Sequence, residues 1–343
     1  MLIAYLLAGL FALLVCAFGP AIGQRLGVMD VPDGRRKLHA SPTPLVGGIA
    51  VLVPPVVLGV FQSLGSVWYP LYLCFALVTA FFVVLGYIDD RRHIRALLRL
   101  VISVVVVGSV FWLVPGLSVT VLSFSFGELV PPVLLGPWVG MAFSVLCLVG
   151  LQNAANMADG KNGLVIGISL IWTILLFAYA PDHLDPFLIA LTVTLGVALA
   201  FNLSGKVFLG DAGTYGLSVI IGMITLYSYN VGFATFPADA VALMFLIPVV
   251  DTLRLIVARG IKGRSPFSPD REHLHHILLS LVPWHWALTV YLALVGLPSL
   301  VARYNVEWTG GLAVAALTVY ALIVSQKYRN LGVPASGGEQ VSD

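Results

Sequence analysis

Two adjacent carboxylates at the end of a long apolar run are the first candidates for chemistry in this sequence. The run, Val67–Ile88, contains no charged residue and is long enough to cross a bilayer. It ends on Asp89 and Asp90, and several arginines follow. An ionised side chain in the bilayer costs about 2.5–3.5 kcal/mol even on insertion-based scales. The pair is therefore expected to meet a cation, which would be a basic side chain, a proton or a metal ion.

The two aspartates are expected to differ in role. Neighbouring residues on a helix point about 100° apart, so both side chains are unsuited to facing one ion directly. We expect one to face a site while the other pairs with arginine. Ion pairing with the arginines is an alternative that would explain both.

Two further segments are rich in oxygen ligands. In Asn153–Leu164, the residues Asn153, Asn156 and Asp159 follow one another at i,i+3 and would share one helical face. Amide and carboxylate oxygens suit Mg²⁺ or a nucleotide, and a helix cap is the alternative. In Asn202–Gly216, Asp211 precedes a new apolar run, where it could act as an N-cap. The glycines around it favour close approach of a phosphate-bearing ligand.

Two basic segments complete the set of polar loops. The segment 33–48 is basic and then turn-rich, so it is either a phosphate-facing loop or a basic loop that marks membrane orientation. The segment 262–276 carries three histidines in a basic loop that contains proline. Zinc is an alternative for these histidines, but no cysteines accompany them. Phosphate binding fits the composition better.

The composition indicates a multi-spanning membrane protein. Of the 343 residues, 59% are hydrophobic and only 10% are charged, and the mean hydropathy is +0.99, whereas soluble domains carry about 25% charged residues. The net charge is +2 and no basic cluster resembles a nucleic-acid footprint, so no nucleic-acid partner is expected. The three cysteines lie in apolar runs without metal-ligand spacing.

Eleven apolar runs have spanning length, which predicts an all-α polytopic fold. They lie at about 2–20, 45–62, 68–88, 97–115, 134–152, 163–180, 187–203, 212–229, 238–257, 284–302 and 309–326. With eleven spans, every Lys and Arg except Arg303 falls on one face. The positive-inside rule makes that face cytoplasmic, with the N-terminus outside and the C-terminus in the cytoplasm.

The rest of the chain is short connections. The segment Ser118–Phe126 alternates apolar and polar residues, which predicts a small periplasmic β-hairpin near 118–130. We expect residues 1–331 to form one transmembrane domain and 332–343 to be a disordered cytoplasmic tail.

The position of the polar loops favours an enzyme over a transporter. All five lie on the predicted cytoplasmic face, whereas secondary transporters place their key charges near the bilayer midplane. Asp251 is the one candidate for such a charge, and Arg254 one turn later is expected to pair with it. Aspartate together with Mg²⁺, Arg, Lys and His suits phosphoryl transfer.

Five segments, taken in order along the chain, resemble the polyprenyl-phosphate N-acetylhexosamine-1-phosphate transferases. They are PLVGG, the Asp-Asp pair, NAANMADG, VFLGDAG and SPFSPDREHLHH. Within that family, the last segment is most similar to bacterial enzymes that use UDP-N-acetylglucosamine. The resemblance implies a bacterial inner-membrane enzyme, with its active site on the cytoplasmic face, that transfers N-acetylglucosamine-1-phosphate to undecaprenyl phosphate and releases UMP. It implies the first step of a lipid-linked cell-envelope glycan of O-antigen, enterobacterial common antigen or teichoic-acid type.

The resemblance also implies roles for individual residues. Mg²⁺, with Mn²⁺ as an alternative, would be bound by Asp211 and Asn156. Catalysis would involve Asp89, Asp90, Asp159 and His276. The nucleotide sugar would contact Asn156, Asn162, Phe208, Lys262, Arg264, His273 and His275. The lipid phosphate would contact Lys37 and Arg99. Asn162 stands where many relatives carry Asp, and His93 stands where some carry a further Asp.

Several alternatives remain open at this point. The sugar could be a 6-deoxy or diamino hexosamine, or the donor could be UDP-N-acetylmuramoyl-pentapeptide. The oligomeric state is open, a homodimer included. A phosphate monoester has its second pKa near 6 and is largely ionised at neutral pH. We therefore expect Asp89 or Asp90 to orient a basic side chain, or the proton of the phosphate, rather than to act as a general base.

Overall fold

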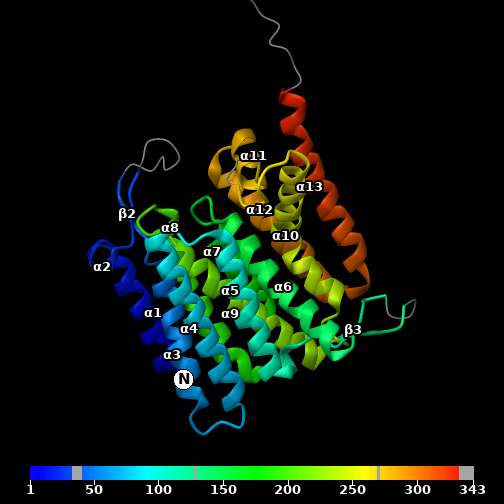
Figure 1. The fold of residues 1–343 in the computed structure, drawn as a ribbon, viewed down its shortest axis with the longest axis horizontal. Coiled ribbons are helices and arrows are strands. Elements are labelled where there is room, and N and C mark those ends of the chain that lie inside the picture. The colour runs from blue at the N-terminus through cyan, green and yellow to red at the C-terminus, as the bar shows by residue number, and fades with distance from the viewer. Residues whose placement is uncertain (33–40, 127–129, 269–270, 332–343) are drawn as a thin grey trace, which may run out of the picture.

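The computed structural model describes residues 1–32, 41–126, 130–268 and 271–331, with the backbone alone for 328–331. Helices dominate these residues (Figure 1). The α-helices are α1 (Leu2–Ala17), α2 (Gly19–Leu26), α3 (Gly47–Ser63), α4 (Tyr69–Arg92), α5 (Ala96–Leu113), α6 (Pro137–Ala158), α7 (Leu164–Leu176), α8 (Asp185–Leu203), α9 (Gly210–Gly232), α10 (Ala238–Ile261), α11 (Leu274–Leu281), α12 (Trp284–Tyr304) and α13 (Thr309–Leu331). Short 3-10 helices lie at Pro115–Leu117, Asp182–Leu184 and Val306–Trp308.

Each of the eleven apolar runs expected from the sequence coincides with one of these helices, and α2 and α11 are short additions. By length and hydropathy, 7 helices in the described residues can cross a membrane: α4, α5, α6, α8, α10, α12 and α13. The number becomes 8 if α1 and α2, which meet at a bend of 74°, count as one span. The all-α polytopic membrane class is thus confirmed. The number of eleven spans and the placement of the termini stay predictions.

Helix α9 is the centre of the larger helix group. It packs most extensively on α4, and also on α6, α3 and α7, and nearly all its side chains are buried. Glycines let its backbone come close to neighbouring helices. A Cβ atom on Gly86 of α4 would lie 2.3 Å from the carbonyl oxygen of Asp211, and one on Gly48 of α3 would lie 2.3 Å from the Gly213 nitrogen. The first turns of α9 are therefore held directly against α3 and α4.

The C-terminal helices form a second group beside the first (Figure 1). Helix α10 packs on α12 and α13, and the short helix α11 lies against α12 and α13. Contacts of α12 with α7, and of α10 with α6, join the two groups. Helix α11, which carries two of the three clustered histidines, lies at the top of the bundle in Figure 1.

Strand structure in the described residues is limited to two pairs. β1 (Met29–Asp30) pairs antiparallel with β2 (Thr43–Pro44), just before α3. β3 (Val121–Leu122) pairs antiparallel with β4 (Val133–Leu134). The hairpin predicted near 118–130 contains β3 but ends before β4, and its tip at 127–129 lies outside the described residues. Its periplasmic location stays a prediction.

Candidate active site

Asp90 caps the helix that carries Asp211. Its Oδ1 accepts the backbone N–H of Asp211 at 2.9 Å, and its Oδ2 accepts that of Ala212 at 3.2 Å. No side chain from the segment just before α9 supplies a cap, so the free N–H groups of the first turn are satisfied from α4. Gly210 has φ +73°, and a Cβ atom there would lie 2.8 Å from Asp90 Oδ2. A glycine is therefore needed at Gly210 for both conformation and space.

Asp89 has a different set of partners and is 2% exposed. Its Oδ2 accepts hydrogen bonds from Arg99 at 2.5 Å and from the Tyr215 hydroxyl at 2.7 Å, while its Oδ1 accepts the backbone N–H of Ile94 at 2.7 Å. The carboxylate is thus buried, ion-paired and supplied with three donors. The two adjacent aspartates thus have different partners, as expected. Asp89 is the residue that fixes the position of Arg99.

Asp211 and Asn156 meet across the α6–α9 contact. Asn156 Nδ2 donates to Asp211 Oδ1 at 2.6 Å and lies 3.3 Å from the Thr214 hydroxyl. Asn153, the first member of the predicted face, instead donates to the carbonyl of Val149 in its own helix. The structure therefore brings together the two residues that were assigned to the metal from distant segments.

Four carboxylates surround this point with little positive charge among them. Asp211 interacts electrostatically with Asp89, Asp90 and Asp159. Arg99 is the cation within hydrogen-bonding distance of this group in the described residues, and it is bound to Asp89. Such an excess of negative charge favours a bound divalent cation.

The donor set fits Mg²⁺ in its chemistry. In the described residues, no group of three or more His, Cys, Asp or Glu side chains is arranged to hold a metal ion by itself. Mg²⁺, however, is usually held by one or two carboxylates, water and substrate phosphates rather than by a complete protein cage. Asp211 provides a carboxylate, and Asn156, whose Nδ2 donates to that carboxylate, carries an amide oxygen as a second candidate ligand. These residues would hold the ion together with a diphosphate substrate.

Asn202 ties together the two loops assigned to the nucleotide. Its Oδ1 accepts the backbone N–H of Gly163 at 2.5 Å, and its Nδ2 donates to the Val207 carbonyl at 2.9 Å. Asn162 and Phe208, the residues assigned to uracil, are the immediate neighbours of these two positions, and both are half-buried. The backbone of Phe208 is also hydrogen-bonded to Pro44 and Gly47. A Cβ atom on Gly47 would lie 2.8 Å from the Phe208 carbonyl oxygen, which explains the glycine at this position of PLVGG.

The histidine loop is fixed by Asp251, deep in α10. Asp251 Oδ2 accepts the backbone N–H of Leu274 at 3.1 Å and lies 2.9 Å from His273 Nδ1. Its Oδ1 accepts bonds from Arg254 at 2.8 Å and from the Tyr320 hydroxyl at 2.9 Å. The expected Asp251–Arg254 pair is confirmed, and Asp251 also caps α11. A carboxylate engaged in this way is not a free mid-membrane charge of the kind that a transporter would need.

The rings of the three histidines lie side by side, with His273 stacked on His275 and His276 tilted against His275, and they differ in burial. His273 is 7% exposed and His275 is 2% exposed, whereas His276 is half-buried. The ring of His275 lies 4.2 Å from that of His276, centroid to centroid. Burial, followed by the charges of His276 and His273, lowers the pKa of His275 to about 3. His275 is therefore neutral at neutral pH.

His275 also connects its loop to the NAANMADG segment. Its Nε2 is buried without a hydrogen-bond partner in the described residues, and a Cβ atom on Gly160 would lie 2.5 Å from it. Asp159 directly precedes Gly160. Of the three histidines, His276 is thus the most accessible to a ligand at this junction.

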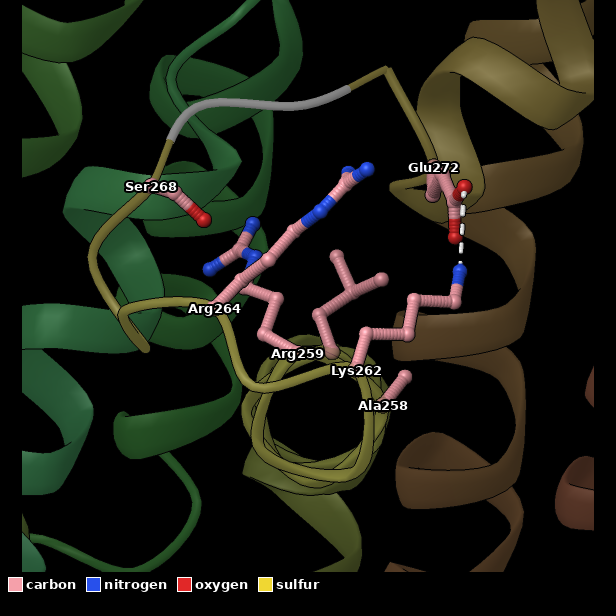
Figure 2. A pocket seen from close by; sticks show the side chains of 7 residues that line it. Ala258, Arg259, Lys262, Arg264, Ser268 and Glu272 are labelled. Carbon is pink, nitrogen blue, oxygen red and sulfur yellow. Dashed lines mark ion pairs between the residues drawn. The ribbon is translucent and has the colours of Figure 1, made fainter.

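Lys262 and Arg264 line a separate pocket at the end of α10 (Figure 2). Arg259, which is 5% exposed, and Glu272 also line it, and Lys262 Nζ lies 3.8 Å from Glu272 Oε1. None of the contacts described above links Lys262 or Arg264 to Asp211, so the structure does not bring these two assigned residues to the carboxylates. Lys37 lies outside the described residues.

Two residues of the site were not singled out from the sequence. Tyr215 stands four residues after Asp211, which places both on one face of α9, and this spacing was the available signal. Asn202 is a polar residue in the last turn of an apolar helix. A polar side chain at that position could have indicated a hydrogen bond to neighbouring loops. In both cases, the partner lies more than thirty residues away in the sequence.

Known proteins resemble this chain over most of its length. Residues 72–229 match the model of glycosyl transferase family 4. The probable undecaprenyl-phosphate N-acetylglucosaminyl 1-phosphate transferase of Bacillus subtilis (strain 168) is 26% identical over 338 residues, covering 94% of this chain and 91% of the relative. The undecaprenyl-phosphate alpha-N-acetylglucosaminyl 1-phosphate transferase of Escherichia coli (strain K12) is 31% identical over 288 residues, covering 79% and 74%. The protein of that name from Yersinia pestis is 30% identical over 284 residues, with the same coverage.

Proposed function

The chain belongs to the polyprenyl-phosphate N-acetylhexosamine-1-phosphate transferases of glycosyl transferase family 4, and from this premise we propose that it transfers N-acetylglucosamine-1-phosphate from UDP-N-acetylglucosamine to undecaprenyl phosphate. The observation that carries the proposal is the contact between Asp211 and Asn156 at 2.6 Å among further carboxylates. The names of the relatives support this donor and this acceptor. The reaction would take place at the cytoplasmic face of a bacterial inner membrane and would begin a lipid-linked envelope glycan.

The reaction needs no proton acceptor on the enzyme. An oxygen of the lipid phosphate attacks the β-phosphorus of the nucleotide sugar, the bond from that phosphorus to the bridging oxygen breaks, and the electron pair leaves with UMP. The lipid phosphate is largely ionised at neutral pH. Asp89 already accepts three hydrogen bonds and is buried, so its role is to hold Arg99 toward the lipid phosphate.

The main barrier is repulsion between two anionic substrates. Asp211 and Asn156 would hold Mg²⁺, which when bound neutralises phosphate charge. Arg99 supplies positive charge on the lipid side. Asp90 fixes the N-terminal turn of α9, whose N–H groups and dipole also favour an anion nearby. The protein thus contributes positioning and charge compensation.

The nucleotide end is assigned to the loops joined by Asn202. Phe208 would stack on uracil and Asn162 would contact its edge, while His276 would contact the diphosphate. Asp159, which directly follows α6, would add a further carboxylate near the metal that Asp211 would hold. His273 and His275 are too buried to contact substrate fully and are proposed to support His276.

The decisive experiment offers purified protein undecaprenyl phosphate, Mg²⁺ and a panel of UDP-sugars and measures UMP release. Release should require both substrates and be fastest with UDP-N-acetylglucosamine. Preference for a 6-deoxy or diamino hexosamine, or for UDP-N-acetylmuramoyl-pentapeptide, would change the sugar but keep the reaction class. No UMP release with any donor would overturn the proposal.

The metal assignment needs its own test with a readout other than turnover. Binding of Mn²⁺, used as a spectroscopic substitute for Mg²⁺ and measured by electron paramagnetic resonance in the presence of UDP, should be lost in Asp211→Asn and weakened in Asn156→Ala. Asp239→Asn provides a control carboxylate, because Asp239 interacts with Ser125 on another connection. Unchanged Mn²⁺ binding and turnover in Asp211→Asn would show that the assignment is wrong.

A further inference from the structure

Tyr215 joins Asp89 and Arg99 in one buried cluster that links three helices. Tyr215 is on α9, Asp89 on α4 and Arg99 on α5. The Tyr215 hydroxyl donates to Asp89 Oδ2 at 2.7 Å, and Arg99 donates to the Tyr215 oxygen at 2.5 Å. The Arg99 guanidinium also lies 5.9 Å from the centre of the Tyr215 ring. Tyr215 therefore contacts both members of the ion pair.

The cluster fixes one end of Arg99 and leaves the rest of the group available. One nitrogen of the guanidinium contacts both Asp89 and Tyr215, while the Arg99 side chain keeps 24% of its surface exposed. A guanidinium has five N–H donors in a rigid fork. Holding one nitrogen in place restricts the orientation of the remaining donors, two of which can bind a phosphate.

Asp89 alone would not determine this orientation. A carboxylate and a guanidinium can pair in several geometries, and α5 has few buried side chains that would restrict Arg99. The Tyr215 oxygen adds a second fixed point. It belongs to the same face of α9 as Asp211, so it relates the position of Arg99 to that of the carboxylate assigned to the metal.

We propose that Tyr215 is a positioning residue for the lipid phosphate, acting through Arg99. This inference rests on the proposed function, because it takes the lipid phosphate as the anion that Arg99 binds. It assigns Tyr215 no contact with substrate and no proton transfer. Its expected consequence is selective: affinity for the phosphate acceptor depends on the Tyr215 hydroxyl, and affinity for the UDP-sugar does not.

The test compares Tyr215→Phe with Tyr229→Phe. Tyr229 lies on the same helix and is equally buried, at 3% exposed, and its hydroxyl also makes two hydrogen bonds, to Val121 and Ser123. The melting temperature should fall by a similar amount in both variants. Only Tyr215→Phe should raise KM for undecaprenyl phosphate, by about five-fold, the effect of one lost hydrogen bond. KM for the UDP-sugar should stay unchanged in both.

A double variant tests whether the effect passes through Arg99. Tyr215→Phe should cause no further loss in an Arg99→Gln background, whereas independent roles would give additive losses. Equal KM for undecaprenyl phosphate in Tyr215→Phe and wild type, or a matching rise in Tyr229→Phe, would overturn the proposal.

Direct binding separates this proposal from the proposed function. Labelled undecaprenyl phosphate, with undecaprenol as the uncharged control, is offered to the protein without any UDP-sugar. Wild type should prefer the phosphate, and Tyr215→Phe should lose part of that preference. Absence of preference in the wild type would count against the proposed acceptor itself, while retained preference in Tyr215→Phe would count against Tyr215 alone.

Discussion

The carboxylate of Asp90 accepts the backbone N–H of Asp211, at 2.9 Å, and so caps the helix on which Asp211 stands. Asp90 and Asp211 are more than a hundred residues apart in the sequence. The two conspicuous acidic positions of the site are thus directly connected, one through its side chain and the other through its backbone. Asp89 instead accepts hydrogen bonds from Arg99 and Tyr215.

Substitutions of the adjacent aspartates should therefore differ in kind. Asp90→Ala removes both acceptors at the start of α9 and should cost about 1 kcal/mol of stability, as other lost caps do, and should lower kcat by displacing Asp211. Asp90→Asn keeps one acceptor and should be milder. Asp89→Asn should chiefly raise KM for undecaprenyl phosphate, because Arg99 loses its counter-ion. Thermal unfolding and steady-state kinetics measure both effects, and identical kinetic defects would contradict the division of roles.

The close approach of α4 to α9 predicts a large effect at Gly86. The Cβ atom of Gly86→Ala would lie 2.3 Å from the Asp211 carbonyl oxygen, so the helices must separate, at a cost of about 1–3 kcal/mol. Gly108 of α5 is the matched control, since a Cβ atom there has no neighbour within 4 Å. Gly108→Ala should be neutral or stabilising by up to about 1 kcal/mol. Similar melting temperatures for the two variants would refute the packing argument.

The Asp251 network predicts that α13 influences the histidine loop. Tyr320→Phe removes the hydroxyl that bonds to Asp251 and Arg254. Amide hydrogen exchange should accelerate in 272–276, and KM for the UDP-sugar should rise, while KM for undecaprenyl phosphate stays constant. Asp251→Ala should be more severe, because it leaves Arg254 without its counter-ion and α11 without its cap. Unchanged exchange in both variants would show that the loop is held by other contacts.

The lowered pKa of His275 predicts that the folded protein loses stability in acid. This pKa is about 3 in the folded protein, against about 6.5 when unfolded. Between these values the unfolded state binds more protons, so stability falls as pH decreases from about 6.5, by up to about 1.4 kcal/mol per pH unit. The variant His275→Gln removes this titration and should show a shallower decline in melting temperature between pH 6.5 and 4.5. Parallel declines for wild type and variant would show that other groups dominate.

The sequence by itself determined the membrane class and the position of the long helices. Hydropathy reflects the solvent around a segment and needs no knowledge of its neighbours, so each apolar run could be recognised alone. The motifs likewise identified the family, and i,i+3 spacing drew attention to Asn156 and Asp159. Local helical geometry was sufficient for Asn156, whereas Asp159 follows the last residue of α6 and has a non-helical backbone conformation.

Only the tertiary structure decided what each polar side chain does. From the sequence, Asp211 could have capped its own helix. The sequence also did not decide which of Asp89 and Asp90 faces the site and which pairs with arginine. The structure places Asp90 on the cap, Asp89 on Arg99 and Tyr215, and Asp251 on the histidine loop. These partners come from other helices, and their distance in space depends on how the helices pack. A hydrogen bond requires groups within about 3 Å, and no local pattern in the chain specifies that distance between segments so far apart.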